Sequence, residues 1–199
     1  TYPTTIIGLR NYNGDISPVN VQNSGGTFEN RGSGAVITGD YIAGNGAVTK
    51  AEIGTKLHVK GIVNLSGRNT LKQTMGNKYI TAKPMTSTVI ESEKGVNGSF
   101  DKVETPELIT ASVKSGDKSV DVTVSRKNVE DYVSTSSVGD AMRNNVAGNL
   151  ETSFKELDSQ IERGNIKETS AFARNAALIQ KMSLPTAAAV LDSLSGQIY

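Results

Sequence analysis

The sequence predicts a mainly β fold, the end of a β-solenoid with a cap of strands, followed by a helical segment. Sixteen of the 20 glycines precede Asn128. Short runs rich in Val, Ile and Thr lie between these glycines, as strands lie between tight turns. After Asn128, apolar residues recur at helical spacing instead. The chain therefore changes from strands to helices near this residue.

Strands are predicted where β-branched and apolar residues alternate with polar ones. The clearest runs are residues 35–38, 56–60, 61–65 and 120–124. In the last run, Val120, Val122 and Val124 face one side and Asp121 and Thr123 the other, because side chains alternate along a strand. Glycine-containing separators such as residues 25–26, 44–46 and 97–98 provide the positive φ angles of tight corners.

Strands this short, without helical patterns between them, exclude a doubly wound α/β fold. A sandwich or barrel and a solenoid both remain open. The recurrence of corner and strand over residues 23–28, 37–41 and 56–61 favours the solenoid, although no strict repeat length holds.

Three segments are expected along the chain. Residues 1–82 form solenoid rungs. Residues 83–127 form capping strands at 88–91, 98–103, 108–113 and 119–124, with a hairpin turn at 114–118. Residues 128–199 form a helical segment.

Four helices are predicted in the last segment. Asn128 caps the first, which runs through Val133, and Ser136 or Ser137 caps the second. An apolar stripe defines the second helix, which ends at Gly164; its members are Val138, Met142, Val146, Leu150, Phe154, Leu157 and Ile161. The third runs over about 167–182. Pro185 opens the fourth, which has Leu191, Leu194 and Ile198 on its apolar side.

Composition excludes several classes of protein. The net charge of +1 gives no reason to expect nucleic acid as a partner. The absence of Cys excludes disulfides, thiolate catalysis and Cys-ligated metal, and it suits both the cytosol and proteins that cross a periplasm unfolded. No signal peptide and no apolar run long enough to span a membrane is present. Because the chain opens without Met, we expect it to come from a longer precursor.

Catalytic chemistry is not expected in this chain. Its single histidine, His58, lies on the polar face of a predicted strand, which indicates a surface residue rather than a catalytic base or metal ligand. Glu91 and Glu93 resemble a glycosidase carboxylate pair in spacing. Lys94 is adjacent and no aromatic sugar platform is nearby, so a solvated strand end is expected.

Binding sites are not expected either. The Gly-rich turns lack a Walker lysine and a strand-to-helix setting, which argues against nucleotide binding. Met142 and Phe154 are expected in the core of the helices. The basic cluster of Ser125, Arg126 and Lys127 is expected to be a solvated end of the last strand. No catalytic, cofactor-binding or metal residue is therefore assigned, and no cofactor or small-molecule ligand is expected.

The chain resembles the C-terminal end of an autotransporter passenger (type V secretion), most closely that of the subtilisin-like serine protease autotransporters. Residues 21–28 with 37–41, and residues 56–61 with 63–67, resemble late β-helix rungs. Residues 79–82 with 95–103, and then 122–129, resemble the closing segment and exit strand. Residues 189–199 resemble the stretch before the translocator barrel. The resemblance covers most of residues 20–199, and residues 1–19 match nothing in the family.

The resemblance implies a right-handed parallel β-helix end and a non-catalytic stem at the bacterial cell surface. The stem would fold first as an autochaperone and join the upstream passenger to the downstream outer-membrane barrel, its two partners. The protease domain of the parent, with its catalytic residues, would lie upstream. An adhesin-type solenoid that binds a host surface or matrix remains the alternative.

Overall fold

The computed structural model describes residues 9–10, 16–30, 34–135, 141–183, 185–187 and 189–190. The chain divides into two compact units. The first, here called the β unit, comprises Thr1–Gly76, Thr86–Thr105 and Ala111–Thr123. The second, the helical unit, comprises Asn77–Met85, Pro106–Thr110 and Val124–Tyr199.

Strands dominate the chain up to Arg126. A short antiparallel pair comes first, β1 (Leu9–Arg10) with β2 (Ile16–Ser17). The following strands are β3 (Val21–Asn23), β4 (Thr27–Asn30), β5 (Ala35–Ile37), β6 (Tyr41–Ala43), β7 (Val48–Glu52), β8 (Leu57–Val59), β9 (Ile62–Leu65), β10 (Thr70–Thr74), β11 (Met85–Ser92), β12 (Gly95–Gly98), β13 (Lys102–Glu104), β14 (Ile109–Ser115) and β15 (Ser119–Arg126).

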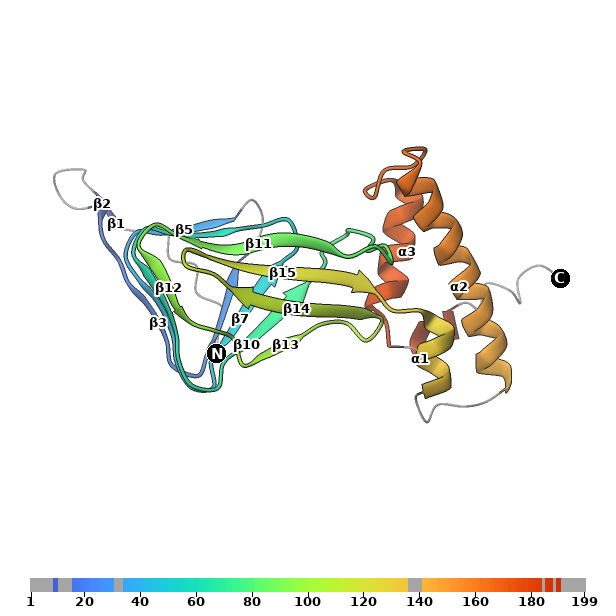
Figure 1. The fold of residues 1–199 in the computed structure, drawn as a ribbon, viewed down its shortest axis with the longest axis horizontal. Helices are drawn as coiled ribbons and strands as arrows, with labels where there is room; N and C mark the ends of the chain where they lie inside the picture. Colours follow the sequence, from blue (N-terminus) through green and yellow to red (C-terminus); the bar gives the residue numbers. More distant parts are fainter. Residues whose placement is uncertain are drawn as a thin grey trace. The chain divides into compact units, whose positions relative to one another are not determined.

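Strands β3 to β13 build three larger sheets in which each strand pairs with the strand three places along the chain, and β14 and β15 extend the third of them (Figure 1). The orders are β12-β9-β6-β3, β13-β10-β7-β4 and β14-β15-β11-β8-β5. Every pair between strands three places apart, from β3–β6 to β10–β13, is parallel. From β3 to β14, consecutive strands thus belong to different sheets, and the chain visits all three sheets before it returns to the first.

The spacing between paired residues is regular at first and then lengthens. Val21, Tyr41 and Val63 are neighbours in one sheet, at intervals of 20 and 22 residues. The next neighbour, Val96, follows 33 residues later. The longer interval contains Asn77–Met85, a segment of the helical unit. The repeat is therefore regular except where the chain contributes a segment to the other unit.

Alternate side chains of the strands form the core of the β unit. Tyr41 and Leu57 are almost fully buried, and the rings of Tyr41 and Phe28 lie 5.2 Å apart. The hydroxyl of Tyr41 forms a 2.6 Å hydrogen bond with the Thr49 hydroxyl, since a buried phenol needs a polar partner. Burial raises the pKa of Tyr41 above its usual range, although this hydrogen bond opposes the shift.

An antiparallel hairpin closes the third sheet. Only residues 116–118 separate β14 from β15, and the Gly116 N–H donates to the Ser119 carbonyl at 2.8 Å, which confirms the predicted turn. The side-chain hydroxyls of Thr86 and Thr123 form a hydrogen bond, and the Thr88 hydroxyl donates to the Asp121 carboxylate. Because the partner number falls as the β11 number rises, β15 runs antiparallel to β11. Inward residues Val120, Val122 and Val124 are fully buried, as their alternation predicts.

The prediction of a single strand over residues 98–103 is wrong. Strand β12 ends at Gly98 and β13 begins at Lys102. Gly98 has a φ of +81°, which takes the backbone out of the extended region and ends the strand.

Helices follow the last strand: α1 (Val129–Thr135), α2 (Ala141–Glu162) and α3 (Ala171–Lys181). The Asn128 side chain accepts from the Asp131 N–H at 3.0 Å, which confirms the predicted N-cap of α1. Gly164, with φ of +74°, follows the end of α2 as predicted. Ser136 and Ser137, the expected caps of α2, lie outside the described residues.

The start predicted for α3 near Lys167 is four residues early. The Ser170 side chain accepts from the Ala173 N–H at 3.2 Å and so caps the helix at Ala171. Residues 185–187 and 189–190 are helical, consistent with the predicted start of a fourth helix. Leu191, Leu194 and Ile198 lie outside the described residues.

The helical unit has its own core. The predicted stripe of α2 buries Leu150, Phe154 and Leu157, whereas Val146 and Ile161 are half-buried. Val138 and the side chain of Met142 lie outside the described part of the chain. Tyr79, Leu108, Val129, Val133, Ala147, Ala173 and Ala177 complete this core.

The fold class is confirmed in its broad form: mainly parallel β-sheets come first and helices follow. Among the helices of the described residues, none combines the length and the apolar character needed to cross a membrane.

Candidate functional site

His58 lies on the outer face of β8, where it forms a small charged cluster with the next strand of the sheet. Its ring nitrogens lie 3.4 Å from a Glu91 carboxylate oxygen and 2.9 Å from one of Glu93. Glu91 is also 2.8 Å from the Lys56 ammonium. Hydrogen bonds from Lys56, then from His58, lower the pKa of Glu91 below its usual range.

This cluster has the properties of a solvated strand face. The Glu91 and Glu93 side chains are 44% and 53% exposed, and Lys94 is exposed as well, which confirms the expected solvated strand end. No group of His, Asp or Glu side chains among the described residues is arranged to hold a metal ion. The cluster joins neighbouring strands across the sheet and brings together no nucleophile.

Arg126 corrects one prediction from the sequence. The cluster of Ser125, Arg126 and Lys127 is not a solvated strand end, because the Arg126 side chain is only 2% exposed. Strand β15 alternates with period two, and Arg126 continues the inward set begun by Val120, Val122 and Val124. Lys127 remains half-buried, with its ammonium 4.7 Å from the centre of the Tyr132 ring.

Two carboxylates of α2 neutralise the buried guanidinium. Arg126 donates to both Glu151 oxygens at 3.0 and 3.1 Å, and its Nε donates to Asp158 at 2.8 Å. Glu151 also accepts from the Val129 N–H at 2.8 Å, at the start of α1. A buried charge is tolerated only when it is paired and hydrogen-bonded, and here both conditions hold.

Tyr79 completes this group of side chains, here called the Arg126 network (Tyr79, Arg126, Glu151 and Asp158). Its hydroxyl donates to Asp158 at 2.7 Å, and its ring lies 5.7 Å from that of Phe154. Burial raises the pKa of Tyr79 far above its usual range, and the hydrogen bond to Asp158 adds to the shift. Burial opposes the charge of Arg126, but its interactions with Asp158, Tyr79 and Glu151 together outweigh burial and raise the pKa of Arg126.

A second set of polar contacts joins segment 77–85 to α3 and α2. The Gln180 side chain of α3 accepts from the Ile80 N–H at 2.9 Å and donates to the Ile80 carbonyl at 2.7 Å. The Ala82 N–H donates to Asp158 at 3.2 Å. Segment 77–85 is thereby fastened to α2 and α3 through its backbone. These buried, mutually satisfied groups suit a structural role, because each is already bonded within the protein.

The strands β3, β4 and β5 form the candidate functional surface, here called the open edge. In all three sheets of the described chain, the end strand on one side comes from this consecutive set. An end strand presents unpaired backbone N–H and C=O groups to any strand that arrives beside it. The three edges therefore offer one continuous template for further parallel strands.

An interior side chain at the open edge lacks a partner. Asn30 is 3% exposed, and both its amide nitrogen and its amide oxygen have no hydrogen bond. Gln73, two strands along in the same sheet, donates its amide nitrogen to the Ala51 carbonyl at 3.2 Å, but its amide oxygen also lacks a partner among the described residues. An unmet buried amide costs about 1–3 kcal/mol. A strand stacked on β4 would place a backbone carbonyl beside the Asn30 amide nitrogen, as β7 does for Gln73.

The other predicted residues fall as follows. Phe154 is buried in the helical core, as expected, whereas the Met142 side chain lies outside the described residues. The sequence singled out neither Tyr79 nor Asn30. Glu151 and Asp158 were missed as well, although acidic residues seven apart on one helix can meet a single cation.

None of the comparisons made with known proteins finds a match to this chain, whether with family models, with curated proteins or with solved structures.

Proposed function

We propose that this chain is the stem and autochaperone-like segment of an autotransporter passenger, a non-catalytic module at the surface of a Gram-negative bacterium. In this proposal the β unit is the last part of a right-handed parallel β-helix. The upstream passenger, for which a subtilisin-like serine protease is the best candidate, continues the β-helix from the open edge. The helical unit precedes the outer-membrane barrel in the chain.

The observation that carries the proposal is the polarity of the three sheets. One end consists of β3, β4 and β5, which remain edges among the described strands. At the other end β12 and β13 are the end strands of two sheets, and the third sheet ends in the β14–β15 hairpin; this end is here called the closed end. The Val96 N–H of β12 donates to the Asp117 carbonyl of the hairpin turn at 2.8 Å. In this proposal the hairpin obstructs further strands at the closed end, so the stack grows from the open edge, as a folding template requires.

Templating is favourable for a physical reason. The first parallel strand pair must bring together residues 20 positions apart before any contact offsets the lost chain entropy. Each later strand adds to an existing edge. A stable closed end thus removes the nucleation step for the strands upstream.

The helical unit suits an anchoring segment because it folds around a core of its own. The Arg126 network gives this unit a specific internal arrangement, since any shift of α2 would separate buried opposite charges.

The test is surface display of the longer precursor with and without residues 98–124. We expect the intact passenger to resist added protease at the cell surface. The deletion should leave it degraded or retained, while antibody detection of the barrel in the outer membrane serves as the control for expression. Normal, protease-resistant display of the deleted protein would overturn the proposal.

A finer comparison uses two glycines with the same backbone angle. Gly98 and Gly54 both have φ of +81°, but a Cβ at Gly98 would overlap the Leu65 carbonyl whereas one at Gly54 meets nothing within 4 Å. Gly98→Ala should reduce display and Gly54→Ala should reduce it much less. Equal display of the two variants would count against a folding role for the closed end.

A further inference from the structure

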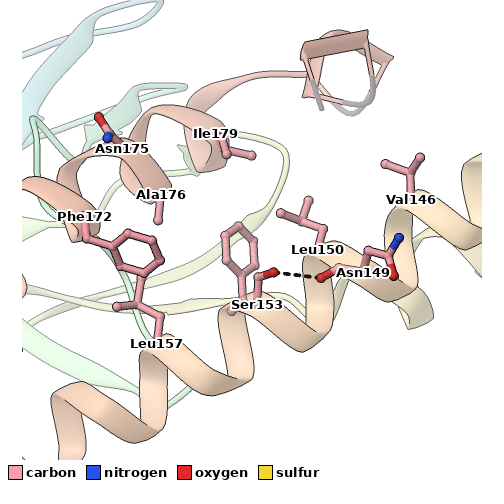
Figure 2. A pocket seen from close by; sticks show the side chains of 10 residues that line it. Val146, Asn149, Leu150, Ser153, Leu157, Phe172, Asn175, Ala176 and Ile179 are labelled. Carbon is pink, nitrogen blue, oxygen red and sulfur yellow. Dashed lines mark hydrogen bonds between the residues drawn. The ribbon is translucent and has the colours of Figure 1, made fainter. Parts of the chain in front are cut away.

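An apolar groove runs between α2 and α3 of the helical unit (Figure 2). It encloses about 440 Å³. Val146, Leu150 and Leu157 line it from α2, and Phe172, Ala176 and Ile179 line it from α3. The remaining lining residues are uncharged too, so the groove favours an apolar occupant without a strong charge.

The rim of the groove is more exposed than a finished core would be. Phe172 is 63% exposed, although its ring points toward Leu157 in Figure 2. Val146, Ala176 and Ile179 are half-buried, whereas Leu150 and Leu157 are buried, so the apolar surface that an occupant could cover lies at the rim of the groove. An occupant that fits the groove would remove more of the apolar surface of Phe172 from water, which favours binding.

The chain carries a suitable occupant next to the groove in sequence. Helical residues 185–187 and 189–190 follow α3, and Ala187 is buried. Nine further residues follow the end of the described chain at Val190. Among them Leu191, Leu194 and Ile198 recur at spacings of three and four, and Asp192 is the only charged side chain.

We propose that the C-terminal segment 191–199 binds this groove through Leu191, Leu194 and Ile198. Nine residues span about 13 Å as a helix and about 30 Å extended, so the segment is long enough to cover the roughly 10 Å between Phe172 and Ile179 along α3. A tethered segment also has an effective concentration near the millimolar range, so it outcompetes a second copy or a free peptide at ordinary protein concentrations.

Cysteine cross-linking tests the proposal on the full chain, because the chain contains no Cys of its own. Ser153 lines the groove and is exposed. The test variant combines Ser153→Cys with Ser195→Cys and is treated with a short bis-maleimide reagent. The matched control combines Ser195→Cys with Lys155→Cys, because Lys155 is 62% exposed, is not among the groove-lining residues and is only two positions from Ser153 on α2.

We expect intramolecular cross-linking of the Ser153 variant to be several-fold faster than that of the Lys155 control. Adding Leu194→Asp should reduce it several-fold, and adding Asp192→Asn should leave it unchanged. Equal rates for the two cysteine pairs would overturn the proposal, as would a rate insensitive to Leu194→Asp. Cross-links that form only between chains and rise with protein concentration would overturn it too and would assign the groove to a second copy.

Discussion

Arg126 is a buried cation of the helical unit and pairs with two carboxylates. It lies at the end of β15, contacts Glu151 and Asp158 of α2, and has its guanidinium carbon 5.4 Å from the centre of the Phe154 ring. Replacement by a group without charge removes the closest cation from two buried carboxylates, and Glu151 keeps only the Lys155 ammonium at 4.0 Å. The cost of that loss exceeds what the intact pair contributes, because an unpaired buried charge keeps its full desolvation penalty.

Arg126→Met should therefore lower the free energy of unfolding by about 3–5 kcal/mol. Lys127→Met provides the matched control, because Lys127 is the neighbouring cation and makes a half-buried contact with the Tyr132 ring that is worth about 0.5–1 kcal/mol. Urea unfolding followed by circular dichroism at a helix wavelength measures both. Similar losses for the two variants would show that the Arg126 network does not stabilise the helices.

The raised pKa of Tyr79 predicts that the stability of the folded chain falls at alkaline pH. Because the folded pKa of Tyr79 is raised, an unfolded chain loses this proton near the ordinary tyrosine pKa of about 10 while the folded chain keeps it. The contribution of Tyr79 is thus fully present below about pH 10 and is lost as the pH rises further.

Between about pH 8 and about pH 11 the intact chain should lose about 1 kcal/mol more stability than Tyr79→Phe. The comparison isolates Tyr79 from Tyr41 and Tyr132, whose raised pKa values act in the same direction in both proteins. The measurement is the free energy of unfolding of each protein at the two pH values. An identical loss would mean that the Tyr79 hydroxyl is not held in the protonated form by folding.

At the scale of the elements, the glycine that ends β12 decides how closely neighbouring strands approach. Gly98 pairs with Leu65 of β9, and a side chain there would overlap the Leu65 carbonyl. Gly98→Ala combines backbone strain with this overlap. Gly54→Ala has the same φ but open space, so it isolates the strain.

We expect Gly54→Ala to cost about 1–2 kcal/mol, the penalty of a side chain in the left-handed region. Gly98→Ala should cost about 1–3 kcal/mol more, because overpacking is added to strain. Thermal unfolding followed by circular dichroism at a β-strand wavelength measures the difference. If the two alanine variants unfold alike, β12 does not pack against β9 as described.

The sequence predicts those elements whose signals are local. The alternation of Val120, Val122 and Val124 predicts a buried face, and Asn128 and Gly164 predict the helix ends at which they lie. In each case the cause lies within a few residues of the effect. The change from strands to helices, between Arg126 and Val129, was predictable for the same reason.

Features that depend on distant partners were not predictable. Strand β10 was missed because its interior positions include the polar Gln73, which bonds the Ala51 carbonyl on the neighbouring strand. Arg126 was assigned to solvent because its partners Glu151 and Asp158 are 25 and 32 residues away. Ser170 was overlooked as a cap, and the third helix was predicted to begin at about Lys167.

At the scale of the whole molecule, the arrangement of the three sheets implies an order of folding within the β unit. The closed end and the neighbouring strand β11 include the β14–β15 hairpin, whose loop is only residues 116–118. This hairpin forms early because its loop is short. The strands of the open edge gain contacts only after β6, β7 and β8 are in place. The proposed function requires this order, because a template must form before the strands it directs.

The measurement that tests this order most directly is pulsed hydrogen exchange during refolding of the chain from denaturant. The account predicts that amides of β11, β12, β14 and β15 acquire protection before those of β3, β4 and β5. In the folded chain, the same closed-end amides should exchange more slowly than those of the open edge. Protection of the open edge first, or of both ends at one rate, would contradict a stem that folds from its closed end.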